Sequence, residues 1–387
     1  PQGPMRRRVH QVEKRWSTDQ LITGIELQDW IKLLDQNGWR VDPTYFHRFA
    51  WITGWALPAT LLGRLEDARY ARQLATMPID PTPLFILGHW RSGTTHLHNL
   101  LGRDPNHTYT TVYQCVFPTS FLTGNALNVP GLTGRFLTDT RTYDNVKHGW
   151  NEAAEDEIAL AKLCGLLPYI SFMFPDNAPR YAKYVDFIEC TERERQVWKD
   201  ALSYLVKKVM IATGGKRVVV KSCTHAARIR LLLEMFPDAK FVHIHRNPYE
   251  CFASTLHMRS HTDWENFFHL PDENYEGERI EQTAQLGQRI FERLYEDKHL
   301  IPEQNYYEVA YEDLCGNELQ YLREIYARFN LPDWDAYHAT ISDYLDGLKG
   351  YRRNDLNINQ DLMDLVWDRW RVAFDAYGYP REYPPAT

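Results

Sequence analysis

Short apolar runs alternate with longer segments of helical periodicity from about residue 84 onward. Four runs of four to six residues are typical of buried strands in a parallel sheet: 84–87, 217–221, 240–245 and 305–310. The pattern also predicts helices at 94–102, 152–166, 191–213, 226–235, 249–260 and 278–297. This alternation predicts an α/β fold, in which right-handed crossover helices flank a central parallel sheet.

The N-terminal part of the chain has a helical pattern over 16–80 and none of the phosphate-binding motifs. Its longest apolar run, "FAWITGWALPATLLG" at 49–63, is shorter than the ~20 residues that span a bilayer, and Pro58 interrupts it. We interpret it as a buried pair of helices; the alternative is an interfacial patch or lid beside an apolar acceptor. We therefore expect a helical extension over 5–80, packed on a core domain over 81–387.

A glycine-containing loop follows the first predicted strand, in "LFILGHWRSGTTHLHNLLGRDP" at 84–105. In nucleoside-triphosphate loops of this outline, a lysine follows the second glycine. Here Thr94 holds that place after Gly93, and the cation is Arg91, inside the loop. The glycines allow backbone N–H groups to point inward, and the following helix adds the positive end of its dipole. The loop therefore predicts an anion site with arginine as its cation.

Two more strand ends carry cations. Lys221 ends the strand at 217–221, and Arg246 follows the strand at 240–245. Ser254 comes eight residues after Arg246, in the next predicted helix. Since ligands of parallel sheets bind beyond the carboxyl ends of the strands, we expect these residues to converge with the loop on one phosphate-bearing ligand.

Overall composition narrows the classes of partner. The net charge is −7, from 44 basic and 51 acidic residues, so no nucleic acid is expected as a partner. Six cysteines without C-x-x-C spacing argue against a zinc site or a disulfide framework, and favour a reducing compartment. Because no apolar stretch follows the arginines at 6–8, we expect a cytoplasmic location rather than a secreted protein.

Taken together, the motifs resemble those of sulfotransferases that use 3′-phosphoadenosine 5′-phosphosulfate (PAPS). "RSGTT" at 91–95 is similar to the family's 5′-phosphosulfate loop, and "HRNPYECFAS" at 245–254 resembles its 3′-phosphate motif. "VVVKS" at 218–222 matches the strand whose lysine lies near the sulfuryl group, and "YEDL" at 311–314 matches the strand end whose tyrosine contacts adenine. The resemblance covers roughly 84–380 and implies a P-loop NTPase-like fold of three layers.

The resemblance also implies a donor site without a metal ion, with adenosine 3′,5′-bisphosphate as the product. Arg91 and Lys221 would stabilise charge on the sulfuryl group and the leaving phosphate. "LKGYRRND" at 348–355 would close the 3′-phosphate site. The residues expected to bind the donor are Arg91, Ser92, Gly93, Thr94, Thr95, His96, Arg246, Ser254, Tyr311, Arg352 and Arg353.

The chain departs from the family pattern at two places. His96 stands where cytosolic members often have the tryptophan that stacks on adenine. Gln114 lies near the place where tyrosylprotein sulfotransferases have a catalytic glutamate. The general base must therefore come from elsewhere: His225 is slightly favoured, a carboxylate of "EDE" at 155–157, with Glu155 first, is the second candidate, and His148 is a distant third.

The acceptor is expected to be a small molecule with a hydroxyl group. Aromatic residues gather in the insertion over 106–180 and predict a pocket for a steroid- or lipid-like alcohol; they are Tyr113, Phe117, Phe121, Trp150, Tyr169, Phe172 and Phe174. A carbohydrate acceptor is the alternative, because aromatic faces also stack on sugars. Peripheral membrane contact through 49–63 is a further expectation, and the sequence leaves the oligomeric state open.

Two other classes of protein are alternatives to a sulfotransferase. A P-loop kinase or NTPase would need the lysine after Gly93 and an acidic strand end for magnesium. A non-catalytic nucleotide-binding or membrane-peripheral protein would bind the nucleotide without turnover; Lys221 and a candidate base argue against it.

Overall fold

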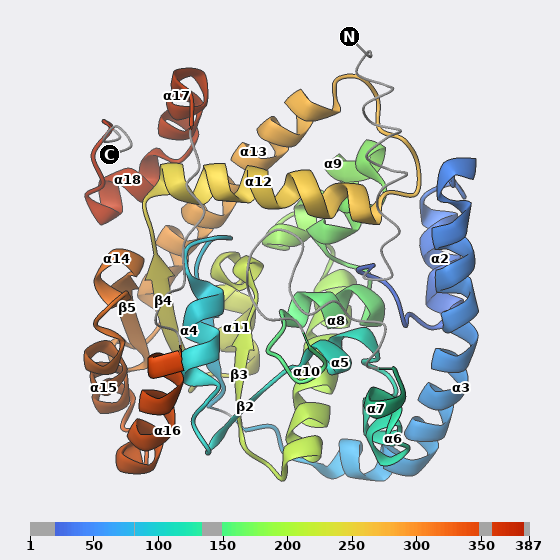
Figure 1. The fold of residues 1–387 in the computed structure, drawn as a ribbon, viewed down its shortest axis with the longest axis horizontal. Helices are drawn as coiled ribbons and strands as arrows, with labels where there is room; N and C mark the ends of the chain where they lie inside the picture. Colours follow the sequence, from blue (N-terminus) through green and yellow to red (C-terminus); the bar gives the residue numbers. More distant parts are fainter. Residues whose placement is uncertain (1–19, 81, 134–148, 348–357, 383–387) are drawn as a thin grey trace. The chain divides into compact units, whose positions relative to one another are not determined.

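The computed structural model describes residues 20–80, 82–133, 149–347 and 358–382 (Figure 1). The chain forms two compact units, each built from three separate stretches of sequence. We call them the helical unit, made of Pro1–Ile79, Thr110–Lys208 and His257–Arg279, and the sheet unit, made of Asp80–Tyr109, Val209–Leu256 and Ile280–Thr387. The expected division into an extension over 5–80 and a domain over 81–387 stays a prediction.

The sheet unit contains one five-stranded sheet in which every neighbouring pair is parallel. The order across the sheet is β2 (His107–Tyr109), β3 (Arg217–Lys221), β1 (Leu84–Leu87), β4 (Lys240–His245) and β5 (Tyr306–Ala310). Three predicted strands have the bounds expected from the apolar runs, and β5 begins one residue later. The predicted parallel α/β sheet is therefore confirmed.

Strand β2 lies in a segment that the sequence analysis left irregular. Its sequence, His-Thr-Tyr, contains no apolar run, and it pairs only with β3 at the edge of the sheet. An edge strand of three residues needs no continuous apolar pattern, because backbone hydrogen bonds to its one neighbour hold it in the sheet. This explains why periodicity missed it.

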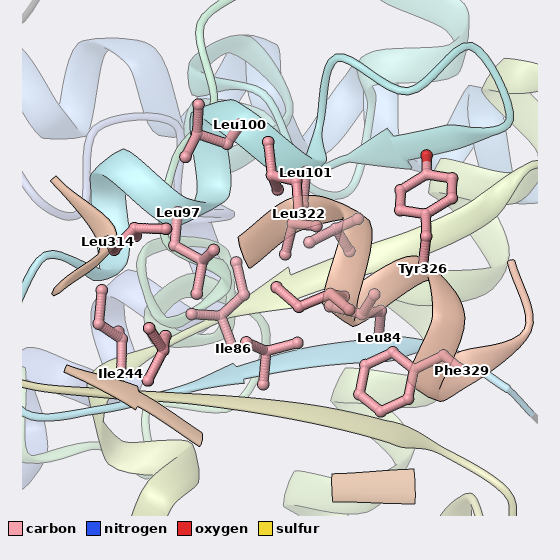
Figure 2. Close-up of a cluster of buried hydrophobic side chains, with 14 of the residues drawn as sticks. Leu84, Ile86, Leu97, Leu100, Leu101, Ile244, Leu314, Leu322, Tyr326 and Phe329 are labelled. Carbon is pink, nitrogen blue, oxygen red and sulfur yellow. The ribbon is translucent and has the colours of Figure 1, made fainter. Parts of the chain in front are cut away.

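Successive apolar residues of the strands point to opposite faces of the sheet and build a core on each face. On one face, Leu84 and Ile86 of β1 pack with α4 (Thr94–Leu101), α15 (Glu318–Phe329) and α16 (Trp334–Gly347), as Figure 2 shows in part. On the other face, Phe85 stacks on Phe241 of β4, with ring centroids 5.4 Å apart. The three layers of the predicted fold follow from this two-residue period.

Further helices complete the sheet unit or pass from one unit to the other. The sheet unit also contains α11 (Ile229–Met235), α14 (Tyr311–Leu314), α17 (Gln360–Arg369) and α18 (Arg371–Tyr377). Three longer helices contribute residues to both units: α10 (Glu192–Thr213), α12 (Pro248–Asn266) and α13 (Tyr275–Asp297).

The helical unit contains α2 (Leu27–Gln36), α3 (Phe46–Thr76), α5 (Val112–Val116), α6 (Phe121–Ala126), α7 (Val129–Thr133), α8 (Asp156–Leu163) and α9 (Ala178–Ala182). A fully buried ion pair joins Glu66 of α3 to Lys208 of α10. Lys208 also donates to the carbonyl of Pro118, and the Glu66 carboxylate accepts from the backbone N–H of Thr123 at 2.6 Å. These contacts fix the inner side of α3.

The interpretation of 49–63 as a pair of helices is wrong, because α3 continues through Pro58 as one helix of 31 residues. Proline removes the hydrogen bond to the carbonyl four residues earlier, here that of Gly54. Gly54 and Pro58 are both exposed, so water can solvate that carbonyl. Among the described helices, none is long and apolar enough to cross a membrane.

Candidate active site

The predicted donor-binding residues of the sheet unit follow the carboxyl ends of four neighbouring strands. Gly88 follows β1, Lys221 ends β3, Arg246 follows β4 and Tyr311 follows β5. The strand register aligns these ends, since Ile86 pairs with Lys221 and His245 pairs with Ala310. In parallel sheets this is the edge at which ligands bind.

The loop after β1 approaches its surroundings so closely that only glycine fits at two positions. A Cβ atom on Gly88 would lie 2.5 Å from the Ile244 carbonyl oxygen, and one on Gly93 would lie 2.4 Å from the Tyr311 ring. Gly93 also has a φ of 100°, a left-handed conformation that favours glycine, and it caps the start of α4. The loop therefore leads its backbone directly into a helix N-terminus, which is the geometry of an anion site.

Arg91 joins the two segments that the sequence assigns to the two phosphates of the donor. Its Nε donates a hydrogen bond to Ser254 Oγ at 2.9 Å, and its carbonyl accepts one from Arg246 Nη1 at 3.3 Å. Arg91 itself adopts a φ of 66°, which costs a non-glycine residue about 1 kcal/mol. The three residues thus form one connected cluster, as expected from their positions after β1 and β4.

The guanidinium of Arg246 is held by a carboxylate that the sequence analysis did not single out. Arg246 Nε donates to Glu250 at 2.8 Å, and its Nη2 makes a second contact with the same oxygen. The guanidinium also lies 4.7 Å from the centre of the Tyr311 ring. The Glu250 carboxylate is an anion bound where the family motif expects a phosphate, so these side chains fit an anionic group. The sequence signal for this contact was the spacing of four residues between Arg246 and Glu250.

A buried histidine anchors the loop, and sequence reasoning missed it. His89 Nδ1 donates to the Trp90 carbonyl at 2.8 Å, and its ring lies against Trp370 and Phe291 at 4.6 and 5.3 Å. Burial lowers the pKa of His89 to about 4, so the ring is neutral near pH 7. No local pattern marks such an anchor, because the two aromatic partners lie about 200 and 280 residues further along the chain.

The remaining loop residues occupy different surroundings. Ser92 is buried and donates to the His89 carbonyl at 2.8 Å. Thr94 is buried against Cys223, whereas Thr95 is half-buried at the start of α4. His96 turns toward α15, where its Nε2 lies 3.3 Å from a Glu318 oxygen. The expected role of His96 at the adenine stays a prediction.

Lys221 and His225 are both in the sheet unit but differ in their surroundings. Lys221 is buried at the end of β3. His225 is fully buried in the 3-10 turn Cys223–Ala227, edge-on to Phe85 with ring centroids 5.7 Å apart. Burial, together with the Arg228 guanidinium, holds the pKa of His225 well below its usual value. A neutral imidazole suits a base, but an acceptor cannot reach this one without movement of the surrounding chain.

The acidic triplet lies in the helical unit, at the start of α8. Asp156 and Glu157 are buried, and Asp156 accepts a hydrogen bond from the Thr110 hydroxyl. Glu155 is half-buried, and its carboxylate accepts a hydrogen bond from the Tyr169 hydroxyl at 2.7 Å. Of the three residues, Glu155 is therefore the least buried.

Four aromatic residues of the helical unit form a contiguous cluster, which we call the aromatic cluster: Trp55, Tyr113, Phe117 and Trp150. Phe117 lies 6.0 Å from Trp55, and Tyr113 lies 5.6 Å from Trp150, measured between ring centroids. Three of the four come from the insertion expected to form the acceptor pocket, and Trp55 comes from α3. Tyr169 and Phe172 stack separately at 5.4 Å, beside Glu155.

Arg352, Arg353 and His148 lie outside the described residues.

A pocket of about 390 Å³ opens beside the ends of β4 and β5, but Glu308, Glu312 and Asp313 line it. This acidic lining does not suit a phosphate, so we do not assign the donor to it.

Comparison with known proteins agrees with the motifs. A family model described as "Sulfotransferase family" matches residues 83–336. The omega-hydroxy-beta-dihydromenaquinone-9 sulfotransferases Stf3 of Mycobacterium bovis and Mycobacterium tuberculosis are each 31% identical over 373 residues, which is 96% of this chain and 94% of the relative.

Two solved structures share the fold. Sulfotransferase STF9 from Mycobacterium avium has a TM-score of 0.68 at 20% identity, and the match covers 96% of this chain and 95% of that one. Sulfotransferase STF1 from Mycobacterium tuberculosis has a TM-score of 0.61 at 17% identity, with 95% and 98% covered. The matching loop, the parallel sheet and the match over nearly the whole length agree: this chain belongs to the sulfotransferase family and is a sulfotransferase enzyme.

Proposed function

We propose that this enzyme transfers a sulfuryl group from PAPS to the hydroxyl of a lipid-like alcohol. The observation that carries the donor assignment is the cluster of Arg91, Ser254 and Arg246, which connects the loop after β1 to the segment after β4. A donor with phosphates at both the 5′ and 3′ positions of one ribose would engage both segments at once.

The charges of the site favour this donor over a nucleoside triphosphate. A kinase would use a lysine after Gly93 and an acidic strand end to hold magnesium. Here β3 ends in Lys221, β4 is followed by Arg246, and Thr94 replaces the lysine. Arg91 and Lys221 would stabilise the charge that develops on the sulfuryl oxygens and on the leaving phosphate.

For the general base we favour Glu155 over His225, which reverses the slight preference drawn from the sequence. His225 is fully buried against Phe85. Glu155 is only half-buried, and its carboxylate accepts a hydrogen bond from the Tyr169 hydroxyl. A carboxylate in this setting can accept the proton of an alcohol as the sulfuryl group is transferred.

The acceptor proposal rests on the aromatic cluster and on the relatives. Apolar rings at Trp55, Phe117 and Trp150 offer contact area to a hydrocarbon or ring system. The relatives at 31% identity are named for an omega-hydroxylated dihydromenaquinone, a lipid with a terminal hydroxyl. Both favour a lipid-like alcohol over the alternative of a carbohydrate.

Calorimetry tests the donor. Titration with adenosine 3′,5′-bisphosphate in the presence of a chelator should give tight binding, whereas adenosine 5′-phosphate and ATP should bind weakly. Preferred binding of ATP with magnesium would contradict the proposal and favour the kinase alternative.

The choice of base is tested by Glu155→Gln and His225→Asn, assayed across a range of pH. Glu155→Gln should lower kcat by ~10²–10⁴-fold and remove the acidic limb of the pH profile. His225→Asn should keep that limb, and loss of the limb in His225→Asn instead would return the role to the histidine.

A further inference from the structure

Helix α3 buries two charged residues and exposes three leucines and a phenylalanine. Its charged residues Arg48 and Glu66 are buried, and Arg48 donates to the carbonyls of Phe267 and Trp264 at 2.7 and 2.8 Å. Its exposed side carries Phe46, Leu57, Leu61 and Leu65, which are 61, 53, 58 and 53% exposed. A surface helix ordinarily points its leucines inward and its charges toward water.

These exposed residues form one continuous stripe. Leu57, Leu61 and Leu65 are spaced by four residues and therefore lie on one side of the helix in successive turns. Toward the N-terminus the exposed positions are Gly54, Ala50 and Phe46, all without charge. We call the stripe the α3 face; it comprises Phe46, Ala50, Gly54, Leu57, Pro58, Leu61 and Leu65 and is about 28 Å long.

Basic residues lie at the C-terminal end of the α3 face, and two tryptophans lie beside it. After Leu61, the exposed charged residues of α3 are Arg64, Asp67, Arg69 and Arg72, so the C-terminal end of the face is net positive. Trp51 and Trp55 are half-buried beside the face, with ring centroids 5.8 Å apart. Tryptophan rings and basic side chains at the edge of an apolar stripe suit the headgroup region of a bilayer that contains anionic lipids.

Trp55, which lies on α3 beside the α3 face, also belongs to the aromatic cluster. Trp55 contacts Phe117, which contacts Trp150 and Tyr113. Ring contacts therefore lead from a tryptophan beside the exposed leucines to the buried and half-buried residues proposed to receive the acceptor. A second copy of the chain or a protein partner would bury the stripe, but neither accounts for the basic residues at its end or for the ring contact from Trp55 to the aromatic cluster.

We propose that the α3 face docks onto the surface of a membrane with anionic lipids, and that the lipid acceptor enters the enzyme there. The second clause rests on the proposed function, whereas the docking does not. The helix lies in the interface rather than crossing it, with its leucines at the boundary between headgroups and acyl chains. An acceptor that partitions into the bilayer then reaches the aromatic cluster without passing through water.

Vesicle co-sedimentation tests the docking. The full chain should bind vesicles of phosphatidylcholine mixed with phosphatidylglycerol, and bind pure phosphatidylcholine more weakly. The triple variant Leu57→Ser/Leu61→Ser/Leu65→Ser should lose about 100-fold in partitioning, because each leucine gives up the burial of its exposed half. The control variant Ile188→Ser/Val197→Ser, at apolar positions that are 50 and 40% exposed but lie outside α3, should bind like the unaltered chain.

Further measurements distinguish a membrane from a second copy of the chain at the α3 face. They also distinguish the docking from the proposed function. Thermal melting should be similar for the triple variant and the control, since these side chains face outward. Failure of the unaltered chain to bind either vesicle, or equal binding by all variants, would overturn the docking. A dimer in sedimentation velocity that dissociates in the triple variant, but not in the control variant, would also overturn the docking. If vesicles bind but no lipid alcohol is sulfated, the proposed function fails and the docking stands.

Discussion

The hydrogen bond between Arg91 and Ser254 offers the sharpest test of the donor site. Arg91 Nε donates to Ser254 Oγ at 2.9 Å, and a hydrogen bond from a charged donor contributes about 1.5–3 kcal/mol. Arg91→Lys keeps the charge and the strained backbone but removes the Nε donor and the planar fork. We expect Arg91→Lys to weaken binding of adenosine 3′,5′-bisphosphate by about 10–100-fold, since 1.4 kcal/mol corresponds to tenfold.

A double-mutant cycle isolates the coupling between the two residues. Calorimetry on the unaltered enzyme, Arg91→Lys, Ser254→Ala and the double variant gives four binding free energies. If Arg91 and Ser254 act as one cluster, the double variant should lose less than the sum of the single losses, by about 1 kcal/mol or more. Effects that add within about 0.3–0.5 kcal/mol would mean that the two residues act independently, and would refute the single connected site.

Three further predictions follow from other contacts. Glu250→Gln frees the charge of Arg246 for the ligand, so the bisphosphate should bind on the order of tenfold more tightly in low salt; unchanged affinity would exclude competition by Glu250. The folded-state pKa of His89, about 4, lies below that of the unfolded chain, so stability should fall by up to ~1.4 kcal/mol per pH unit from pH 6.5 down to 4. Urea unfolding of His89→Leu should show a shallower slope over that range, and an equal slope would contradict the assignment. Lys208→Met leaves the buried Glu66 carboxylate unpaired and should cost about 3–5 kcal/mol in urea unfolding; Lys208→Met/Glu66→Gln should recover part of this, and no recovery would count against the pair.

Local patterns predicted the core of the sheet unit well. The runs at 84–87, 217–221 and 240–245 are continuous and apolar because both faces of a central parallel strand are buried, and this left little room for error in their bounds. The cations after these strands could be assigned to one edge because parallel strands end together. The structure joins Arg91, Arg246 and Ser254 by hydrogen bonds, and their roles in binding the donor stay a prediction.

Features set by distant contacts could not be predicted in the same way. A proline usually ends a helix, yet α3 continues through Pro58. Its inner side is fixed by Arg48 and Glu66, whose partners lie more than fifty residues away in the sequence. The burial of His225 against Phe85 likewise depends on tertiary packing rather than on its spacing from Lys221. Sequence periodicity reports which positions are apolar but not which face of a helix is left exposed.

Sulfuryl transfer itself tests the central claim most directly. The enzyme is incubated with PAPS labelled in its sulfur atom, vesicles that contain a long-chain quinol or alcohol with a terminal hydroxyl, and a chelator in place of metal ions. The account predicts labelled lipid and an equal amount of adenosine 3′,5′-bisphosphate, both of which Lys221→Ala should abolish while binding of the bisphosphate stays nearly unchanged. Labelled sulfur that stays in the donor across a panel of lipid, steroid and sugar acceptors, together with magnesium-dependent transfer of phosphate from ATP, would contradict it.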